Sequence, residues 1–200
     1  GVLAGTVVAV TMGLSGQAMA ANSDEEQLAR MADPDQWPAP GRDFELTRHS
    51  KLSDINTKNV NKLQMSWLQG TNALRGHEGQ PLVIKDVGGK TMLFMVSGCP
   101  SMANCNVVQA LDLTDPDNPK QVWSYVKKDD RDESAVPRAC CDTVNRGGSY
   151  ADGKFVYGTL DGFVIALDGQ TGQEVWVVKY AYPEKGETIT PAPLIADNKV

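Results

Sequence analysis

An internal repeat constrains the fold of this chain more than any other feature. The run Ala110-Leu111-Asp112, followed by Val122-Trp123, recurs as Ala166-Leu167-Asp168 followed by Val175-Trp176. The two copies lie about 55 residues apart, and the turn inside the first copy is the longer one. A unit that recurs at such an interval indicates an architecture of stacked repeats.

Short runs rich in β-branched and aromatic residues surround both copies, which predicts antiparallel strands. The first set comprises PLVIKD (81–86), KTMLFMVSG (90–98), NVVQALDL (106–113) and QVWSYVKK (121–128). The second set comprises RGGSYA (146–151), KFVYGTL (154–160), GFVIALD (162–168) and EVWVVKY (174–180). Asp152-Gly153 and Asp161-Gly162 stand at two of the breaks, and Asp-Gly supplies the positive φ angles of a two-residue hairpin.

Repeated four-strand units predict the blades of a β-propeller, an all-β fold. In this interpretation each repeated tryptophan packs between neighbouring blades, and each Ala-x-Asp marks a third strand and its turn. A coincidence between two ordinary hairpins is the alternative. Because two blades cannot close into a ring, we expect this chain to be an N-terminal fragment whose core continues beyond Val200.

Residues 1–20 carry no charge and end in Ala18-Met19-Ala20 ahead of a polar stretch. An apolar region followed by an A-x-A site is typical of a secretory signal peptide. A buried helix or a short membrane anchor is the alternative, but glycines and polar residues interrupt a stretch that is only marginally long enough to span a bilayer. We therefore expect export, which permits disulfide bonds.

The segment between the signal and the repeats is predicted to contain short helices. Ser23 and Glu26 match a capping box, which predicts a helix through about Met31. A second short helix is predicted over residues 58–64. The expected division of the chain is a signal peptide at 1–20, an N-terminal segment at 21–80 and an incomplete propeller domain at 81–200.

The charge and motif content exclude several functional classes. The net charge of −6, with no basic tract, argues against binding to nucleic acid or to an anionic membrane surface. The sequence has no catalytic-triad, HExxH, CxxC or phosphate-loop pattern, and its two histidines argue against a zinc site. The acidic stretch at 112–117 is predicted to be a solvated turn rather than a calcium loop.

The four cysteines are Cys99, Cys105, Cys140 and Cys141, which allow three sets of pairings. Adjacent cysteines bond to each other only by closing an eight-membered ring across one strained peptide, because neighbouring Cα atoms lie about 3.8 Å apart and ordinary disulfides span about 4.4–6.8 Å. Such a ring presents a rigid, flat sulfur face. Adjacency alone favours the alternative, in which each of the two bonds to Cys99 or Cys105.

The stretch from Cys140 to Gly147, CCDTVNRG, resembles one in methanol and ethanol dehydrogenases that depend on pyrroloquinoline quinone (PQQ), in which a vicinal disulfide lies against the quinone ring. Other segments are similar to parts of the same family, in family order. They are its N-terminal segment (37–63), its first cofactor-contacting loop (75–83), its blade signature (166–176) and its next cofactor loop (186–193). The blade signature occurs in many propellers, whereas the cysteine pair with its downstream arginine is highly specific.

The resemblance implies an eight-bladed propeller in which the Cys140–Cys141 disulfide stacks on one face of PQQ. It also implies that Glu78, Arg146 and Thr190 hydrogen-bond around the cofactor edge. Arg146 would form charge-assisted bonds to carboxylate or quinone oxygens. Because Glu78 would stand beside an anionic cofactor, we expect that it or its partner holds a proton, or that a cation lies close.

The activity that the resemblance implies is periplasmic oxidation of methanol or other primary alcohols to aldehydes, with electrons passed to a c-type cytochrome. One lanthanide or calcium ion is implied beside PQQ, and its ligands and the catalytic aspartate are expected beyond Val200. Thr143 makes the cysteine motif more similar to the lanthanide-dependent branch. The fragment alone is expected to be inactive. A homodimer and a local Cys99–Cys105 disulfide are left open.

Two alternative functions remain. An ethanol-type quinoprotein would accept a broader range of alcohols, although Gly79-Gln80-Pro81 mildly favours the methanol kind. A propeller that serves as a binding scaffold, such as an outer-membrane assembly lipoprotein, would have a lipid-attachment cysteine after the signal and no need for vicinal cysteines. This sequence shows the opposite on both points.

Overall fold

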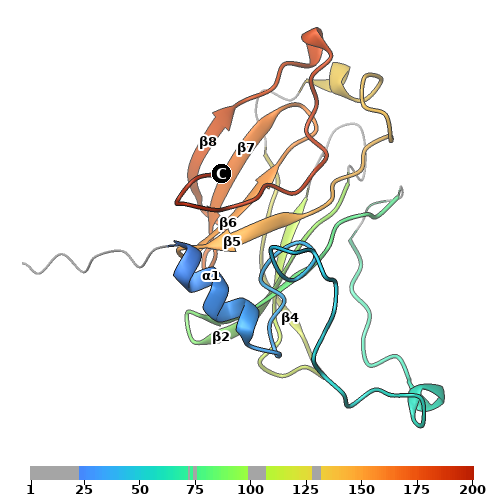
Figure 1. Cartoon of the computed structure of the whole chain (residues 1–200). Helices are drawn as coiled ribbons and strands as arrows, with labels where there is room; N and C mark the ends of the chain where they lie inside the picture. The colour runs from blue at the N-terminus through green and yellow to red at the C-terminus, as the bar shows by residue number, and fades with distance from the viewer. Residues whose placement is uncertain (1–22, 72, 74–75, 99–106, 128–131) are drawn as a thin grey trace, which may run out of the picture.

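The computed structural model describes residues 23–200 except 72, 74–75, 99–106 and 128–131. Two four-stranded sheets form its body, each with its strands in chain order (Figure 1). The elements are α1 (Ser23–Ala32), η1 (Val60–Lys62), β1 (Leu82–Val87), β2 (Lys90–Val96), β3 (Val108–Asp112), β4 (Lys120–Tyr125), η2 (Glu133–Ala135), β5 (Gly148–Ala151), β6 (Lys154–Gly158), β7 (Phe163–Asp168), β8 (Glu174–Lys179) and η3 (Pro183–Lys185).

Each of the eight predicted runs forms one strand, and every pairing within the two sheets is antiparallel. The sequence repeat is also a structural repeat. β3 and β7 are the third strands of their sheets, and each has a register shift against the fourth strand directly after the repeated alanine, Ala110 or Ala166. The two sheets are therefore equivalent four-strand units, as the propeller interpretation predicts.

The main core lies between the two sheets and draws side chains from both. Phe94 of β2 is fully buried, and its ring centroid lies 5.4 Å from that of Tyr150 and 5.2 Å from that of Phe155. Aromatic side chains bury large apolar areas, so this cluster contributes strongly to the contact between the sheets. The sheets depend on each other for burial.

Trp123, the repeated tryptophan of the first sheet, packs against the second sheet. Its indole nitrogen donates a hydrogen bond of 3.1 Å to the carbonyl of Gly169. The indole also covers Gly172, where a Cβ would come within 2.6 Å of the ring. The prediction that this tryptophan packs between neighbouring blades is confirmed.

One of the two predicted two-residue hairpins is confirmed and the other is wrong. Asp152 and Gly153 have φ angles of 48° and 71° and join β5 to β6. Between β6 and β7 the connection spans residues 159–162, and only Gly162 of the Asp-Gly pair has a positive φ. The amide of Gly162 donates to the carbonyl of Thr159, and this bond closes the longer loop.

Helix α1 forms where it was predicted, but the capping box is wrong. The Ser23 hydroxyl accepts a hydrogen bond from the Asn198 amide instead. Glu26 forms an ion pair with Arg30 and accepts a hydrogen bond from the Asp152 amide. Tertiary partners have therefore replaced the local reciprocal bonds of a capping box. In the part of the chain that the structure describes, no helix is long and apolar enough to cross a membrane.

The helix predicted over residues 58–64 is wrong, because only the 3-10 turn η1 forms there. The Asn59 side chain accepts a hydrogen bond from the Asn56 amide and donates one to the Asp54 carbonyl. Such side-chain bonds to the backbone compete with a helix. The segment around η1 lies away from both sheets (Figure 1).

Asp112, at the end of β3, is expected to contribute a pH-dependent part of the stability. Hydrogen bonds from Thr114 and the nearby ammonium of Lys90 lower its pKa from 3.8 to about 2. Because the folded pKa is depressed, this contribution is complete above pH 3.8 and is lost as the pH falls through about 2. Replacing Asp112 with asparagine should lower the free energy of unfolding by about 1 kcal/mol at pH 7, after allowance for solvent screening.

Urea titrations of the wild type and Asp112→Asn at a series of pH values would check this. The difference between the two proteins should shrink as the pH falls below 3.8. A difference that stays constant to pH 2.5 would show that Asp112 acts through packing or hydrogen bonding alone and not through its charge.

Candidate functional site

The vicinal cysteines are joined to each other. Cys140 and Cys141 form a disulfide whose Cα atoms lie 3.8 Å apart. The next residue, Asp142, has a φ of 64°, a left-handed conformation that aspartate tolerates better than most residues. Cys140 is exposed and Cys141 is half-buried. A sulfur-bearing ring therefore stands at the surface of this turn. The Cys99–Cys105 disulfide, which the sequence leaves open, falls outside the described residues.

Close backbone packing holds this turn against the first sheet. Gly98, which follows β2, approaches the turn so closely that a Cβ there would lie 2.4 Å from the Thr143 carbonyl oxygen. A Cβ on Gly79 would lie 2.5 Å from the Val96 oxygen and 3.3 Å from the Asn145 oxygen. Only glycine fits at either position without a backbone shift. The glycines thus allow the segments at 76–80 and 143–147 to meet at the end of β2.

Glu78, Arg146 and Thr190 come together beside the cysteine turn. The Arg146 Nε atom lies 3.3 Å from the Glu78 Oε2 atom, and the two side chains are 50% and 45% exposed. The Arg146 amide donates a 3.0 Å hydrogen bond to the Thr190 carbonyl. Thr190 therefore joins the group through its backbone. The Arg146 guanidinium is thus the cation next to Glu78 in this structure.

The backbone at Arg146 and Gly147 is also bonded to the loop at residues 75–83. The Gln80 amide donates a 3.2 Å hydrogen bond to the Arg146 carbonyl, and Gln80 forms an isolated parallel bridge with Gly147. The Gln80 side chain accepts a 2.6 Å bond from the Gly41 amide. Three segments that are distant in sequence, around residues 78, 146 and 190, therefore meet at one junction.

Asn145 is a site residue that the sequence did not single out. It is 1% exposed, and its carboxamide donates to the Gly158 carbonyl at 2.7 Å and accepts from the Gly147 amide at 2.9 Å. The signal that could have indicated it was its place directly before Arg146 in the cysteine motif. A buried carboxamide at this point needs partners, and the sequence did not show what they were.

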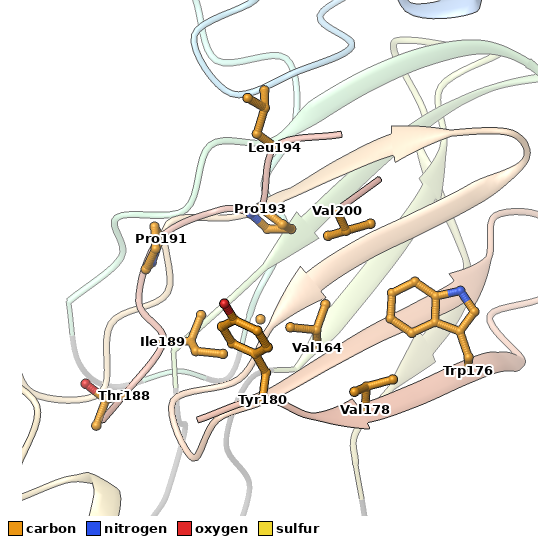
Figure 2. Close-up of a pocket in the computed structure, with 11 residues that line it drawn as sticks. Val164, Trp176, Val178, Tyr180, Thr188, Ile189, Pro191, Pro193, Leu194 and Val200 are labelled. Atoms are coloured by element: carbon orange, nitrogen blue, oxygen red, sulfur yellow. The ribbon is translucent and has the colours of Figure 1, made fainter. Parts of the chain in front are cut away.

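A pocket of about 480 Å³ lies on the second sheet. In Figure 2, Val164, Trp176 and Val178 from β7 and β8 lie opposite Pro191, Pro193 and Leu194 of the C-terminal segment. Its lining is mostly apolar, so it does not suit a small molecule with several carboxylates. No cluster of three or more potential metal-ligating side chains occurs among the residues that the structure describes.

Comparisons with known proteins identify the family of the chain. Residues 37–188 match the PQQ family model described as "Glucose/ethanol/alcohol dehydrogenase, beta-propeller domain". A lanthanide-dependent methanol dehydrogenase of Methylacidiphilum fumariolicum is 45% identical over 94% of this chain and 29% of its own length. Subunit 1 of the methanol dehydrogenase [cytochrome c] of Paracoccus denitrificans is 35% identical over 96% of this chain and 30% of its own length.

A solved structure of a europium-containing methanol dehydrogenase superposes with a TM-score of 0.77 at 44% identity. The match covers 86% of this chain and 28% of that structure. The chain thus spans less than a third of the length of these relatives. Family model, relatives and fold agree, and the chain belongs to the β-propeller family of PQQ-dependent alcohol dehydrogenases.

Proposed function

We propose that these residues form the N-terminal part of a PQQ-dependent dehydrogenase that oxidises methanol or other primary alcohols to aldehydes. The observation that carries the proposal is the Cys140–Cys141 disulfide beside the exposed Arg146–Glu78 pair. A flat sulfur face next to a fixed guanidinium suits a planar, anionic ring. The family membership and the names of its relatives support the same activity.

The residues present fit PQQ, a planar quinone with three carboxylates. The disulfide offers a rigid wall for one face of the ring. Glu78 engages Arg146 at Nε, so the two Nη atoms remain to form a fork onto a carboxylate or a quinone oxygen. Because the guanidinium lies beside Glu78, this carboxylate can stand near an anionic cofactor without uncompensated repulsion.

When bound, PQQ would supply the redox chemistry by accepting the hydride of the alcohol, which carries both electrons of the oxidation. The chain described here supplies one wall and one edge of the slot, through residues 78, 140–141, 146 and 190. These residues orient the ring and restrict water on that side. We assign no catalytic base and no metal ligand within these 200 residues. The chain alone is therefore proposed to be inactive.

The same proposal covers the location of the protein, its metal and its electron acceptor. Residues 1–20 would direct export to the periplasm, residues 21–80 would lead into the propeller, and residues 81–200 would form its first blades. The metal beside PQQ would be a lanthanide or calcium, and two observations favour a lanthanide: Thr143 in the cysteine motif and the lanthanide-dependent relative. A soluble c-type cytochrome would accept the electrons, in keeping with the relative from Paracoccus. A homodimer is left open.

Reconstitution of the complete protein tests this function. With PQQ and either a lanthanide or calcium, it should reduce a dye acceptor at the expense of methanol or ethanol, and omission of PQQ should abolish the reaction. The ratio of kcat/KM for methanol to that for longer alcohols would separate the methanol type from the ethanol type. Binding of PQQ without oxidation of any primary alcohol, with either metal, would contradict the proposed activity.

A further inference from the structure

Asn145 stands at a junction that the proposed function does not explain. Its carboxamide is buried, and both ends of it are used: Nδ2 donates to Gly158 and Oδ1 accepts from Gly147. Gly158 is the last residue of β6, and Gly147 directly precedes β5. The side chain therefore ties the cysteine turn to two neighbouring strands of the second sheet. A buried group of this kind rigidifies its surroundings when it is fully bonded.

Arg146 lies in the chain between Asn145 and Gly147, the residue whose amide donates to the Asn145 side chain. The Arg146 amide donates to Thr190 and its carbonyl accepts from Gln80, so its backbone is fixed from both sides. Its side chain is half exposed, and its guanidinium contacts the Glu78 carboxylate at 3.3 Å. The direction of the guanidinium thus depends on a backbone position that the Asn145 carboxamide helps to set.

We propose that Asn145 is a positioning residue, which presents Arg146 to the cofactor. This inference rests on the proposed function, because it assumes that Arg146 binds PQQ. The role requires a carboxamide. A side chain at this point must donate to one backbone carbonyl and accept from one backbone amide, and an aspartate of the same shape can only accept.

Asn145→Asp removes the donor and places a carboxylate against the Gly158 carbonyl oxygen, which costs the desolvation of both groups. In the complete protein, we expect this variant to bind PQQ about tenfold more weakly or worse, as measured by quenching of intrinsic fluorescence in the apoprotein. Asn145→Ser, which introduces no charge and cannot reach both partners, should show the same direction of change if the aspartate variant folds poorly.

Gln27 provides a matched control outside the group of residues proposed to hold PQQ. It is also a buried carboxamide, 1% exposed, and its Nε2 atom donates to the Ile195 carbonyl at 2.8 Å. Gln27→Glu makes the same chemical change and should lower the thermal midpoint while PQQ affinity stays within about twofold of the wild type. A merely structural role for Asn145 predicts that the two variants behave alike.

A double-mutant cycle with Arg146→Ala tests whether Asn145 affects PQQ binding through Arg146 or independently of it. If Asn145 acts through Arg146, the double variant should bind PQQ no more than about twofold more weakly than Arg146→Ala alone. Multiplicative losses, or wild-type affinity in both Asn145 variants, would overturn the inference and leave the proposed function intact. Failure of the wild type to bind PQQ would overturn both.

Discussion

Replacing Arg146 with alanine is expected to weaken PQQ binding by about two orders of magnitude. The Arg146–Glu78 pair is about half exposed in the structure, and bound PQQ would cover it. Removal of one partner from a hydrogen-bonded charge pair that is buried in a complex costs about 2–5 kcal/mol, which corresponds to about 30-fold to 4000-fold in affinity. Part of the loss arises because Glu78, 3.3 Å from Arg146 in the structure, would face an anionic cofactor without its counter-ion. Fluorescence titration of the complete apoprotein with PQQ measures the effect.

Two comparisons make this prediction specific. Arg138→Ala removes an exposed guanidinium two residues before Cys140. That guanidinium donates to the Ser134 carbonyl, so the change should leave PQQ affinity unchanged. Adding Glu78→Gln to Arg146→Ala should restore part of the affinity, because it removes the unpaired carboxylate. Equal affinities for the two arginine variants would show that Arg146 is a surface ion-pair residue without a role in the slot.

The sequence predicted the strands well because their signals are local. Each run combines β-branched and aromatic residues over a short window, and the breaks carry turn residues. The repeat added information that no single run contains, since Ala110 and Ala166 identified equivalent third strands and Trp123 identified a contact between blades. These features depend on residues that are close in sequence or that recur.

The errors share the opposite cause. Ser23 and Glu26 have the spacing of a capping box, but Asn198 and Asp152 compete for their side chains in the folded chain. The Asp161-Gly162 turn was misjudged because Thr159 closes a longer loop. Local spacing alone cannot show which tertiary partner replaces a local hydrogen bond.

The candidate site falls between these cases. The cysteine motif marked Arg146, and the similarity of the loops marked Glu78 and Thr190, but only the structure shows that their segments meet at one junction. Thr190 contacts Arg146 through its backbone carbonyl, and the identity of its side chain does not predict such a contact. The sequence does not single out Asn145, because its role depends on two backbone partners, one of them thirteen positions later in the chain.

The largest effect on stability is expected from Trp123→Ala. The indole is 8% exposed, and its ring centroid lies 5.8 Å from that of Phe94. Its removal leaves a cavity between the sheets and an unbonded carbonyl at Gly169, so the free energy of unfolding should fall by about 3–5 kcal/mol. Urea denaturation followed by circular dichroism measures this loss without relying on tryptophan fluorescence.

Trp123→Phe divides the loss into its two parts. Phenylalanine keeps an aromatic ring over Gly172 but cannot donate to Gly169, so it should cost about 1–2 kcal/mol, less than alanine. Val122→Ala is the matched control, because its side chain on the same strand is 40% exposed and should cost about 0.5 kcal/mol or less. If Trp123→Ala cost no more than Val122→Ala, the two sheets would not be coupled through this tryptophan, and their contact would depend on the Phe94 cluster alone.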